Sequence, residues 1–289
     1  MVNGKSLFVL INLALISLSC SVFADSLIRP GYGENDDQDL FTGNIAIEGI
    51  SEKEIQQKKT YKVYCIEPET GKINKLLYKS HGTKAKVPDG YFYQIEQPDI
   101  VVSPVNKDDE TILDQCSEYI VLDVDFQVDH ISVLGRTPGP TDTEIKKIET
   151  LFGAAYKTGF PDFVYADNLI FDTPFVSVRF STTEWLLVDS YILREDVDYG
   201  YGYYVPEDIA NKKGAHKFGQ YLYNRKNGTL LLIKPYYLIG EANPIMITSG
   251  KNLYLFGYVM IGKSYGHYEI VLLKGKKAET IFVGSDTGS

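Results

Sequence analysis

Residues 119–130 have the sequence Tyr-Ile-Val-Leu-Asp-Val-Asp-Phe-Gln-Val-Asp-His, in which apolar and polar side chains alternate almost without interruption. Successive side chains of a β-strand point to opposite faces, so the alternation separates an apolar face from a polar one. The pattern predicts a half-buried strand of an antiparallel sheet. The apolar face comprises Ile120, Leu122, Val124, Phe126 and Val128, and the polar face comprises Asp123, Asp125, Gln127 and Asp129.

Shorter runs of the same kind lie upstream, and turn sequences separate them. The runs are 61–67, 73–79, 84–87, 91–95 and 100–105. Two of the intervening turns are Pro-Glu-Thr-Gly at 68–71 and Pro-Asp-Gly at 88–90. Several short strands at regular spacing are typical of a β-sandwich. We therefore predict a β-sandwich domain over 44–135, preceded by a flexible lead over 25–43 and followed by a linker at 136–141.

One helix is predicted with strong signals, over residues 142–157. Thr141 is suited to cap its N-terminus, because Glu144 follows at the spacing of a capping box. Gly159 and Pro161 are suited to end it. Apolar residues recur at helical spacing on one side of this segment, namely Ile145, Ile148, Leu151, Phe152 and Ala155.

Strand-like runs return after the helix. Asn227-Gly228 lies between two apolar runs and predicts a two-residue hairpin turn. The runs 253–261, 268–274 and 279–283 predict a final meander. For the whole chain we predict a mainly β fold with one α-helix, in which the β-sandwich is followed by a mostly antiparallel α+β domain over 142–289.

The first 24 residues have the features of an export signal. Lys5 precedes the apolar run 7–18, and Val22-Phe23-Ala24 offers a small-residue cleavage site. Twelve residues span about 18 Å as a helix, too little to cross a bilayer. We predict cleavage after Ala24, which places the mature chain in the periplasm or outside the cell. Ser19-Cys20 offers the alternative that Cys20 carries a lipid anchor.

Export bears directly on the cysteines. Cys65 and Cys116 are the two that remain after cleavage at Ala24. An isolated pair in an oxidising compartment usually forms a disulfide. We predict this disulfide rather than a redox-active thiol, because the chain contains no Cys-x-x-Cys pair.

The charge balance excludes two classes of partner. The chain has 29 Lys and Arg against 38 Asp and Glu, a net charge of -9. Nucleic-acid phosphates need a basic face, and electrostatic docking on anionic lipid needs basic clusters. No apolar run after the signal approaches the length of a transmembrane helix. We therefore expect no nucleic acid partner and no membrane span.

The segment 257–264, Gly-Tyr-Val-Met-Ile-Gly-Lys-Ser, matches the P-loop pattern. A phosphate-binding loop needs a flexible turn followed by the N-terminus of a helix. Here the intervening residues are apolar, and the residues after Ser264 alternate as in another strand. We therefore predict a β-hairpin at this position, with no bound nucleotide and no other cofactor.

Other chemical motifs are incomplete. Residues 262–266 also match the Gly-x-Ser-x-Gly nucleophile elbow, but His267 follows too closely and no helix is predicted after Ser264. Asp123, Asp125 and Asp129 form an acidic row that we interpret as a solvated sheet face rather than a metal site. The sequence thus selects no catalytic residue and no metal ligand. Any histidine-based site must draw on His81, His130, His216 and His267.

Glu184-Trp185-Leu186-Leu187-Val188 and the later segment 199–209, Tyr-Gly-Tyr-Gly-Tyr-Tyr-Val-Pro-Glu-Asp-Ile, carry a local resemblance. Together they resemble the second half of a bacterial SH3-like module, in which a Trp-x-x-Val strand precedes a Gly-aromatic strand that ends in Val-Pro. The resemblance covers about 26 residues, 184–209. It implies a small barrel in the C-terminal domain that binds peptidoglycan, peptides or protein partners.

Tyrosine is abundant, with 22 residues in the chain. The tyrosine ring offers a large contact area, a polar end and few rotatable bonds, which suits recognition of glycans and proteins. One cluster is interleaved with glycine, and a second pair lies two residues apart on one hairpin strand. The candidate binding residues are therefore Tyr199, Tyr201, Tyr203, Tyr204, Tyr221 and Tyr223.

These features favour an exported, non-catalytic protein that binds a protein partner or a wall glycan in the cell envelope. One form of this function is an inhibitor or immunity-type protein that blocks a hostile enzyme. Two alternatives stay open. The first is an exported hydrolase with a scattered Ser/His or carboxylate site, and the second is a structural subunit of the envelope.

Overall fold

The computed structural model describes most of the chain after the predicted signal. The export signal, with Cys20 and Ala24, lies outside the described residues, and so do Tyr199, Tyr201, Tyr203 and Tyr204. The described residues are 27–34, 43–67, 70–87, 91–92, 95, 97–109, 112, 115–116, 118–135, 138–153, 157–159, 174–192, 219–234, 244–260, 265–285 and 287–288.

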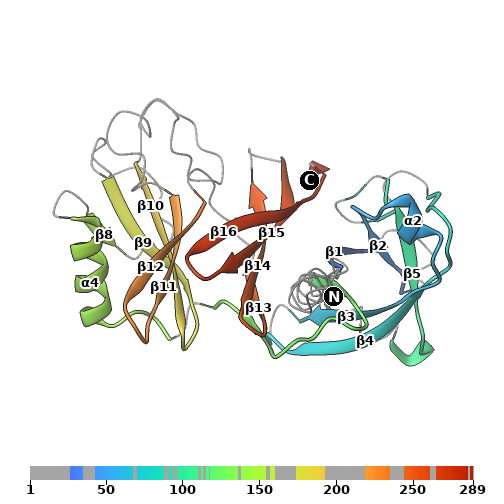
Figure 1. The fold of residues 1–289 in the computed structure, drawn as a ribbon, viewed down its shortest axis with the longest axis horizontal. Coiled ribbons are helices and arrows are strands. Elements are labelled where there is room, and N and C mark those ends of the chain that lie inside the picture. The colour runs from blue at the N-terminus through green and yellow to red at the C-terminus, as the bar shows by residue number, and fades with distance from the viewer. Residues whose placement is uncertain are drawn as a thin grey trace, which may run out of the picture.

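The described N-terminal strands form a closed antiparallel barrel, at the right of Figure 1. Neighbouring strands follow the order β1-β2-β5-β4-β3-β6, and β6 pairs with β1 to close it. This corrects the predicted β-sandwich over 44–135, because one sheet closes on itself where two packed sheets were expected. The strands are β1 (Ile28–Gly33), β2 (Ile45–Ile47), β3 (Thr60–Ile66), β4 (Ile73–Ser80), β5 (Ile100–Pro104) and β6 (Glu118–Asp123).

Alternate residues of these strands fill the barrel. Tyr61, Val63 and Cys65 of β3 point inward and pack with Tyr78 of β4. The predicted disulfide between Cys65 and Cys116 is present, with a Cα–Cα distance of 5.6 Å. It ties the end of β3 to the residues just before β6. Two short helices accompany the barrel, namely α2 (Glu52–Ile55) and the 3₁₀ helix η1 (Lys107–Asp109).

The predicted flexible lead over 25–43 contains a strand. β1 pairs with β6 along residues 28–31, opposite 119–122. Its Pro-Gly sequence is typical of a turn, yet the close approach of other strands requires glycine at position 31. A Cβ atom on Gly31 would lie 2.7 Å from the Ile45 side chain and 3.0 Å from Tyr119. The glycine that suggested flexibility therefore permits the barrel to close.

The alternating stretch 119–130 forms one strand and then a turn. Ile120 and Leu122 share a buried face, as predicted. β6 ends at Asp123, however, and Val124 is 44% exposed in the turn that follows. The chain then enters β7 (His130–Val133), which leaves the barrel and pairs with β13 (Ile245–Ser249).

Two open sheets make up the rest of the described fold. We call the first the central sheet; its order is β16-β15-β14-β13-β7, and β17 also pairs with β15. We call the second the distal sheet; its order is β12-β11-β10-β9-β8, and only its β8–β9 pair is parallel. The remaining strands are β8 (Lys157–Gly159), β9 (Pro174–Ser181), β10 (Trp185–Ile192), β11 (Gly219–Asn224), β12 (Thr229–Lys234), β14 (Asn252–Met260), β15 (Tyr265–Lys274), β16 (Lys277–Val283) and β17 (Thr287–Gly288).

The central sheet is buried on both faces. Figure 1 shows it between the barrel and the distal sheet. On one face Phe256 and Ile270 pack in a cluster with Ile28 and Leu122 of the barrel. On the other face Leu255 packs in a second cluster with residues of the distal sheet. The chain is thus mainly β, as predicted, with three β layers along its length.

The single strong helix prediction is confirmed as α4 (Asp142–Phe152). The Thr141 side chain accepts a hydrogen bond from the backbone N–H of Glu144, and the Glu144 side chain accepts one from the Thr141 backbone, so the predicted capping box is complete. The helix ends earlier than the predicted residue 157, because Gly153 adopts a positive φ of 97°. α4 covers the outer face of the distal sheet through Ile148 and Phe152.

The predicted hairpin at 257–264 is confirmed by the register of its strands. β14 pairs with β15 up to Met260 and Gly266, so the described part of the P-loop match lies in a strand and another strand follows it. The described helices include none that is long and apolar enough to cross a membrane.

The segment that resembles an SH3-like module is described only in its first part. Trp185 and Val188 lie on β10, the middle strand of the open distal sheet. The Gly-aromatic segment 199–209 lies outside the described residues. The small closed barrel of this molecule is built by β1–β6 instead, far from this segment in sequence.

Candidate functional site

The two described tyrosines among the candidate binding residues are buried. Tyr221 is 6% exposed and Tyr223 is 0% exposed. They share one face of β11, as predicted, but α4 covers that face. The Phe152 ring meets the Tyr221 ring edge to face, with centroids 5.1 Å apart. Both rings therefore serve the core and offer no surface to a partner, which corrects their assignment as binding residues.

The acidic row of 123–129 also has structural partners. Asp123 accepts a hydrogen bond from the backbone N–H of Leu27 at 2.9 Å and lies 3.8 Å from the Lys59 ammonium. Asp129 accepts one from the backbone N–H of Gly250 at 2.6 Å. Across the described ranges, no three His, Cys, Asp or Glu side chains are grouped so as to hold a metal ion.

A network of phenols and carboxylates joins the barrel to the central sheet. The Tyr268 hydroxyl of β15 donates to Glu118 of β6 at 2.9 Å. The Tyr32 hydroxyl of β1 donates to Glu48, which also accepts from the Ser285 hydroxyl at 2.7 Å. The rings of Tyr32 and Tyr268 meet edge to face at 5.8 Å. The network therefore links the two layers at two carboxylates.

Burial sets the proton affinity of this network. It raises the pKa of the Glu118 carboxyl to about 7, and the hydrogen bond from Tyr268 opposes this rise only in part. Burial also raises the pKa of the Tyr268 and Tyr32 hydroxyls, and the neighbouring carboxylates add to that rise. The phenols are therefore neutral donors throughout the neutral range, whereas Glu118 titrates within it.

We expect Glu118→Gln to raise the free energy of unfolding by about 2 kcal/mol at pH 8 and to change it little at pH 4. The pKa of Glu118 is higher in the folded chain than the value of about 4.3 in an unfolded chain. The folded state therefore holds a proton that the unfolded state has already lost, and stability falls as pH rises from about 4 to about 7. Glutamine keeps an oxygen acceptor for Tyr268 but carries no charge.

Urea unfolding of the native protein and the variant, measured between pH 4 and pH 9, checks this expectation. Two parallel stability profiles would contradict it. Tyr268→Phe provides the control, because it removes the donor and leaves the carboxyl in place.

Two further polar pairs lie between the central and distal sheets. His267 and Glu269 of β15 are 3.0 Å apart, and both lie on the face that carries Val271 toward the distal sheet. On the distal sheet, Gln220 donates to Asp189 at 3.0 Å, and Asp189 is fully buried. The His267 side chain is 11% exposed and the Glu269 side chain 5%. Such limited exposure favours a structural role over access for a substrate.

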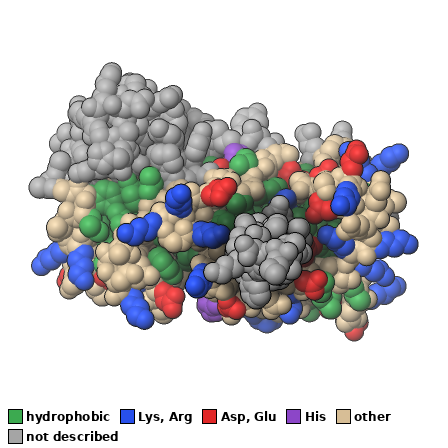
Figure 2. Space-filling model, viewed as in Figure 1, with side chains coloured by type: hydrophobic (Ala, Val, Ile, Leu, Met, Phe, Trp, Pro, Cys, Tyr) green, Lys and Arg blue, Asp and Glu red, His purple; other side chains and the backbone are tan. Residues whose placement is uncertain are grey.

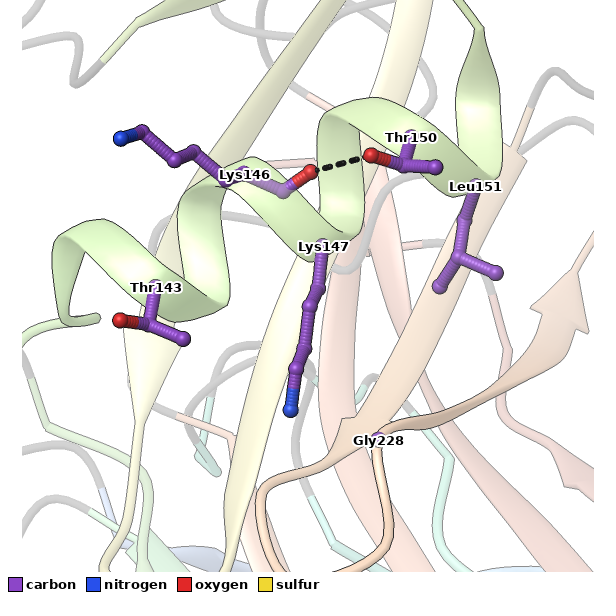
Figure 3. A pocket seen from close by; sticks show the side chains of 6 residues that line it. All are labelled: Thr143, Lys146, Lys147, Thr150, Leu151 and Gly228. Carbon is purple, nitrogen blue, oxygen red and sulfur yellow. Dashed lines mark hydrogen bonds between the residues drawn. The ribbon is translucent and has the colours of Figure 1, made fainter.

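The exposed candidate site is a shallow groove of about 400 Å³ beside α4 (Figure 3). One wall is the outer side of α4 and the other is the turn at Gly228 in the β11–β12 hairpin. Lys147 and Leu151 extend from the helix toward the hairpin side of the groove in Figure 3. The complete lining is Thr143, Lys146, Lys147, Thr150, Leu151 and Gly228.

Leu151 is the unexpected residue of this groove. Its spacing predicts a core position beside Ile148 and Phe152, which are indeed buried. Leu151 is instead 50% exposed. Leu151 lies at the margin of the buried stripe of α4, and it lines the groove together with Gly228 of the hairpin turn. The groove is therefore lined by one large apolar side chain, Leu151, next to two lysines.

A partly buried ion pair connects α4 to the β11–β12 hairpin beside the groove. The Arg225 guanidinium at the end of β11 donates to both carboxylate oxygens of Glu144, at 2.8 and 2.9 Å. Arg225 also donates to the carbonyls of Pro138 and Thr182. Burial acts to raise the pKa of Glu144, but the hydrogen bonds from Arg225 and Thr141 outweigh it and lower that pKa. Bidentate pairs of this kind fix geometry, so the groove is preformed.

Comparison with models of protein families, with curated proteins and with solved structures yields no match to this chain. The function must therefore be argued from the surface itself.

The sequence pattern alone does not predict the groove. Arg225 follows the hairpin strand of Tyr221 and Tyr223, and Glu144 belongs to the capping box, but nothing in the sequence brings residues 81 positions apart together. The network of phenols and carboxylates is even less predictable from the sequence, because its members are spread between residues 32 and 285.

Proposed function

We propose that this chain is an exported, non-catalytic binding protein that recognises a protein partner in the cell envelope. The observation that carries the proposal is the half-exposed Leu151 in a preformed groove beside Lys147. An exposed apolar side chain in a rigid concave surface supplies the anchor of a protein contact. One form of this function is an inhibitor that blocks an enzyme of the envelope.

The lining of the groove favours a peptide segment over a glycan. Glycan sites depend on aromatic stacking, and the six lining residues include no aromatic ring. Lys146 and Lys147 are exposed, so an acidic segment with one apolar side chain fits the groove best. The disulfide supports the extracellular location, because such bonds persist in oxidising compartments. Recognition by Tyr199, Tyr201, Tyr203 and Tyr204 stays a prediction.

We expect a photoreactive phenylalanine at position 151 to crosslink the chain to a partner protein in intact cells. The matched control is the same substitution at Val124, which is exposed to a similar degree, 44% against 50%, and lies on the barrel side of the molecule. With the captured partner purified, Leu151→Ser should weaken affinity by about 5- to 30-fold, the effect of truncating a central anchor. The melting temperature should stay within a few degrees, because the side chain is half exposed.

Two results would contradict this proposal. The first is an identical set of adducts from positions 151 and 124. The second is a captured partner that binds the Leu151→Ser variant as tightly as the native protein. Adducts formed only between copies of this chain would instead indicate the structural-subunit alternative.

A further inference from the structure

The barrel carries a local excess of positive charge within an acidic protein. Residues 51–87 contain nine lysines and four glutamates, whereas the whole chain has a net charge of -9. Figure 2 shows basic side chains over the barrel, at the right of the view.

Three of the lysines surround an exposed aliphatic pair on the outer wall of the barrel. Lys75, Leu77 and Lys79 alternate with buried residues along β4, so all three point outward. Lys62 of β3 lies directly across from Leu77. Val105, just after β5, donates its backbone N–H to the Leu77 carbonyl at 2.9 Å, which brings the two aliphatic residues next to each other.

The aliphatic pair is more exposed than its residue types usually are. Leu77 is 42% exposed and Val105 is 51% exposed. Each alone would be unremarkable on a protein surface. Side by side, and enclosed by charged side chains, they form a small apolar centre with a polar rim, which is the anatomy of an interface. We call Lys62, Lys75, Leu77, Lys79 and Val105 the barrel patch.

The charges of the barrel patch are poorly neutralised. Burial lowers the pKa of Lys62, and repulsion from Lys75 lowers it further, while Asp125 acts in the opposite direction. The Lys62 ammonium donates to the Phe126 carbonyl at 2.7 Å. Within the part of the chain that the structure describes, neither Lys75 nor Lys79 forms an ion pair. The ammonium groups of Lys75 and Lys79 therefore carry positive charge that no ion pair among the described residues offsets.

We propose that the barrel patch binds an acidic protein segment that carries an aliphatic side chain. Carboxylates would neutralise Lys62, Lys75 and Lys79, and the aliphatic side chain would cover Leu77 and Val105. A polyanion without apolar groups would leave the aliphatic pair in water. An anionic membrane would be repelled by the rest of this acidic chain.

The barrel patch is distinct from the groove beside α4. Figure 1 shows α4 and the barrel at opposite ends of the molecule. The inference goes beyond the proposed function, because it adds a second surface whose test does not involve Leu151 or Lys147. With both surfaces occupied, the chain holds two acidic segments at opposite ends of the molecule.

The test uses an acetylated hexapeptide, Asp-Glu-Leu-Val-Glu-Asp, added to the isotope-labelled mature protein. We expect its chemical-shift changes to concentrate on β3, β4 and residue 105, and its affinity to fall as salt is raised. Lys75→Ala combined with Lys79→Ala should weaken binding at least tenfold. Leu77→Ser, which leaves every lysine in place, should weaken it at least threefold. The charge-matched control is Lys274→Ala with Lys277→Ala in the exposed β15–β16 turn, which should change the affinity less than twofold.

Four results would overturn the inference. They are shifts that map elsewhere, equal losses for the two lysine pairs, equal binding of a peptide whose Leu and Val are replaced by serine, and binding of anionic phospholipid vesicles in place of the peptide. Shifts confined to the α4 groove would leave the proposed function standing and reject the barrel patch alone.

Discussion

Loss of the Cys65–Cys116 disulfide is expected to lower the free energy of unfolding by about 4 kcal/mol. The bond joins residues 51 positions apart, and the chain-entropy model gives about this value for a loop of that length. Cys65 is fully buried in the barrel interior, so its replacement by serine also places a hydroxyl in an apolar core. Urea unfolding of Cys65→Ser and Cys116→Ser measures both effects.

The double variant separates the effect of losing the disulfide from the effect of each serine substitution. Either single change already breaks the disulfide. The free energy of unfolding of the double variant should therefore be within about 0.5 kcal/mol of that of Cys65→Ser alone. Quantitative reaction of both thiols in the native, unreduced protein would show that the bond is absent. Cys116→Ser is the cleaner single change, since Cys116 is only partly buried.

The second large effect is expected at Tyr223, whose ring is fully buried between α4 and the distal sheet. Tyr223→Ala should lower the free energy of unfolding by about 3–5 kcal/mol, the usual cost of removing a large core ring. Its hydroxyl has no hydrogen-bond partner among the described residues. Tyr223→Phe should therefore leave stability unchanged or raise it by up to about 1 kcal/mol, because a buried unpaired hydroxyl is unfavourable.

The two substitutions at Tyr223 test burial and recognition separately. If the ring served recognition at a surface, alanine would leave the melting temperature almost unchanged. If the Tyr223 hydroxyl formed a hydrogen bond, Tyr223→Phe would lower the free energy of unfolding by about 1 kcal/mol or more. Thermal and urea unfolding of the two variants distinguish these cases.

Local features of the fold were predictable because they depend on neighbours in sequence. The capping box at Thr141 and Glu144, the hairpin of β14 and β15, and the buried face of Ile120 all follow from spacing alone. Closure of the barrel does not. Strand patterns define which side chains share a face, but they do not define which strand lies beside which, and β1 was hidden by its Pro-Gly sequence.

The candidate site was less predictable than the fold. Spacing correctly placed Tyr221 and Tyr223 on one face, but the packing of α4 decided that this face is core. The same packing left Leu151 outside, although its spacing was that of a core residue. Exposure at these positions depends on contacts between segments about 70 residues apart, and a single sequence carries no direct signal for them.

The place of β7 in the central sheet has a consequence for the order of folding. β7 leaves the barrel early in the chain, yet its partner β13 arrives only after the whole distal sheet has been traversed. Until then, Ile28 and Leu122 on the outside of the barrel lack the cover that Phe256 and Ile270 later provide. During synthesis from the N-terminus, the closed barrel must therefore expose an apolar outer face until the last 45 residues of the chain arrive, and the C-terminal meander then covers that face.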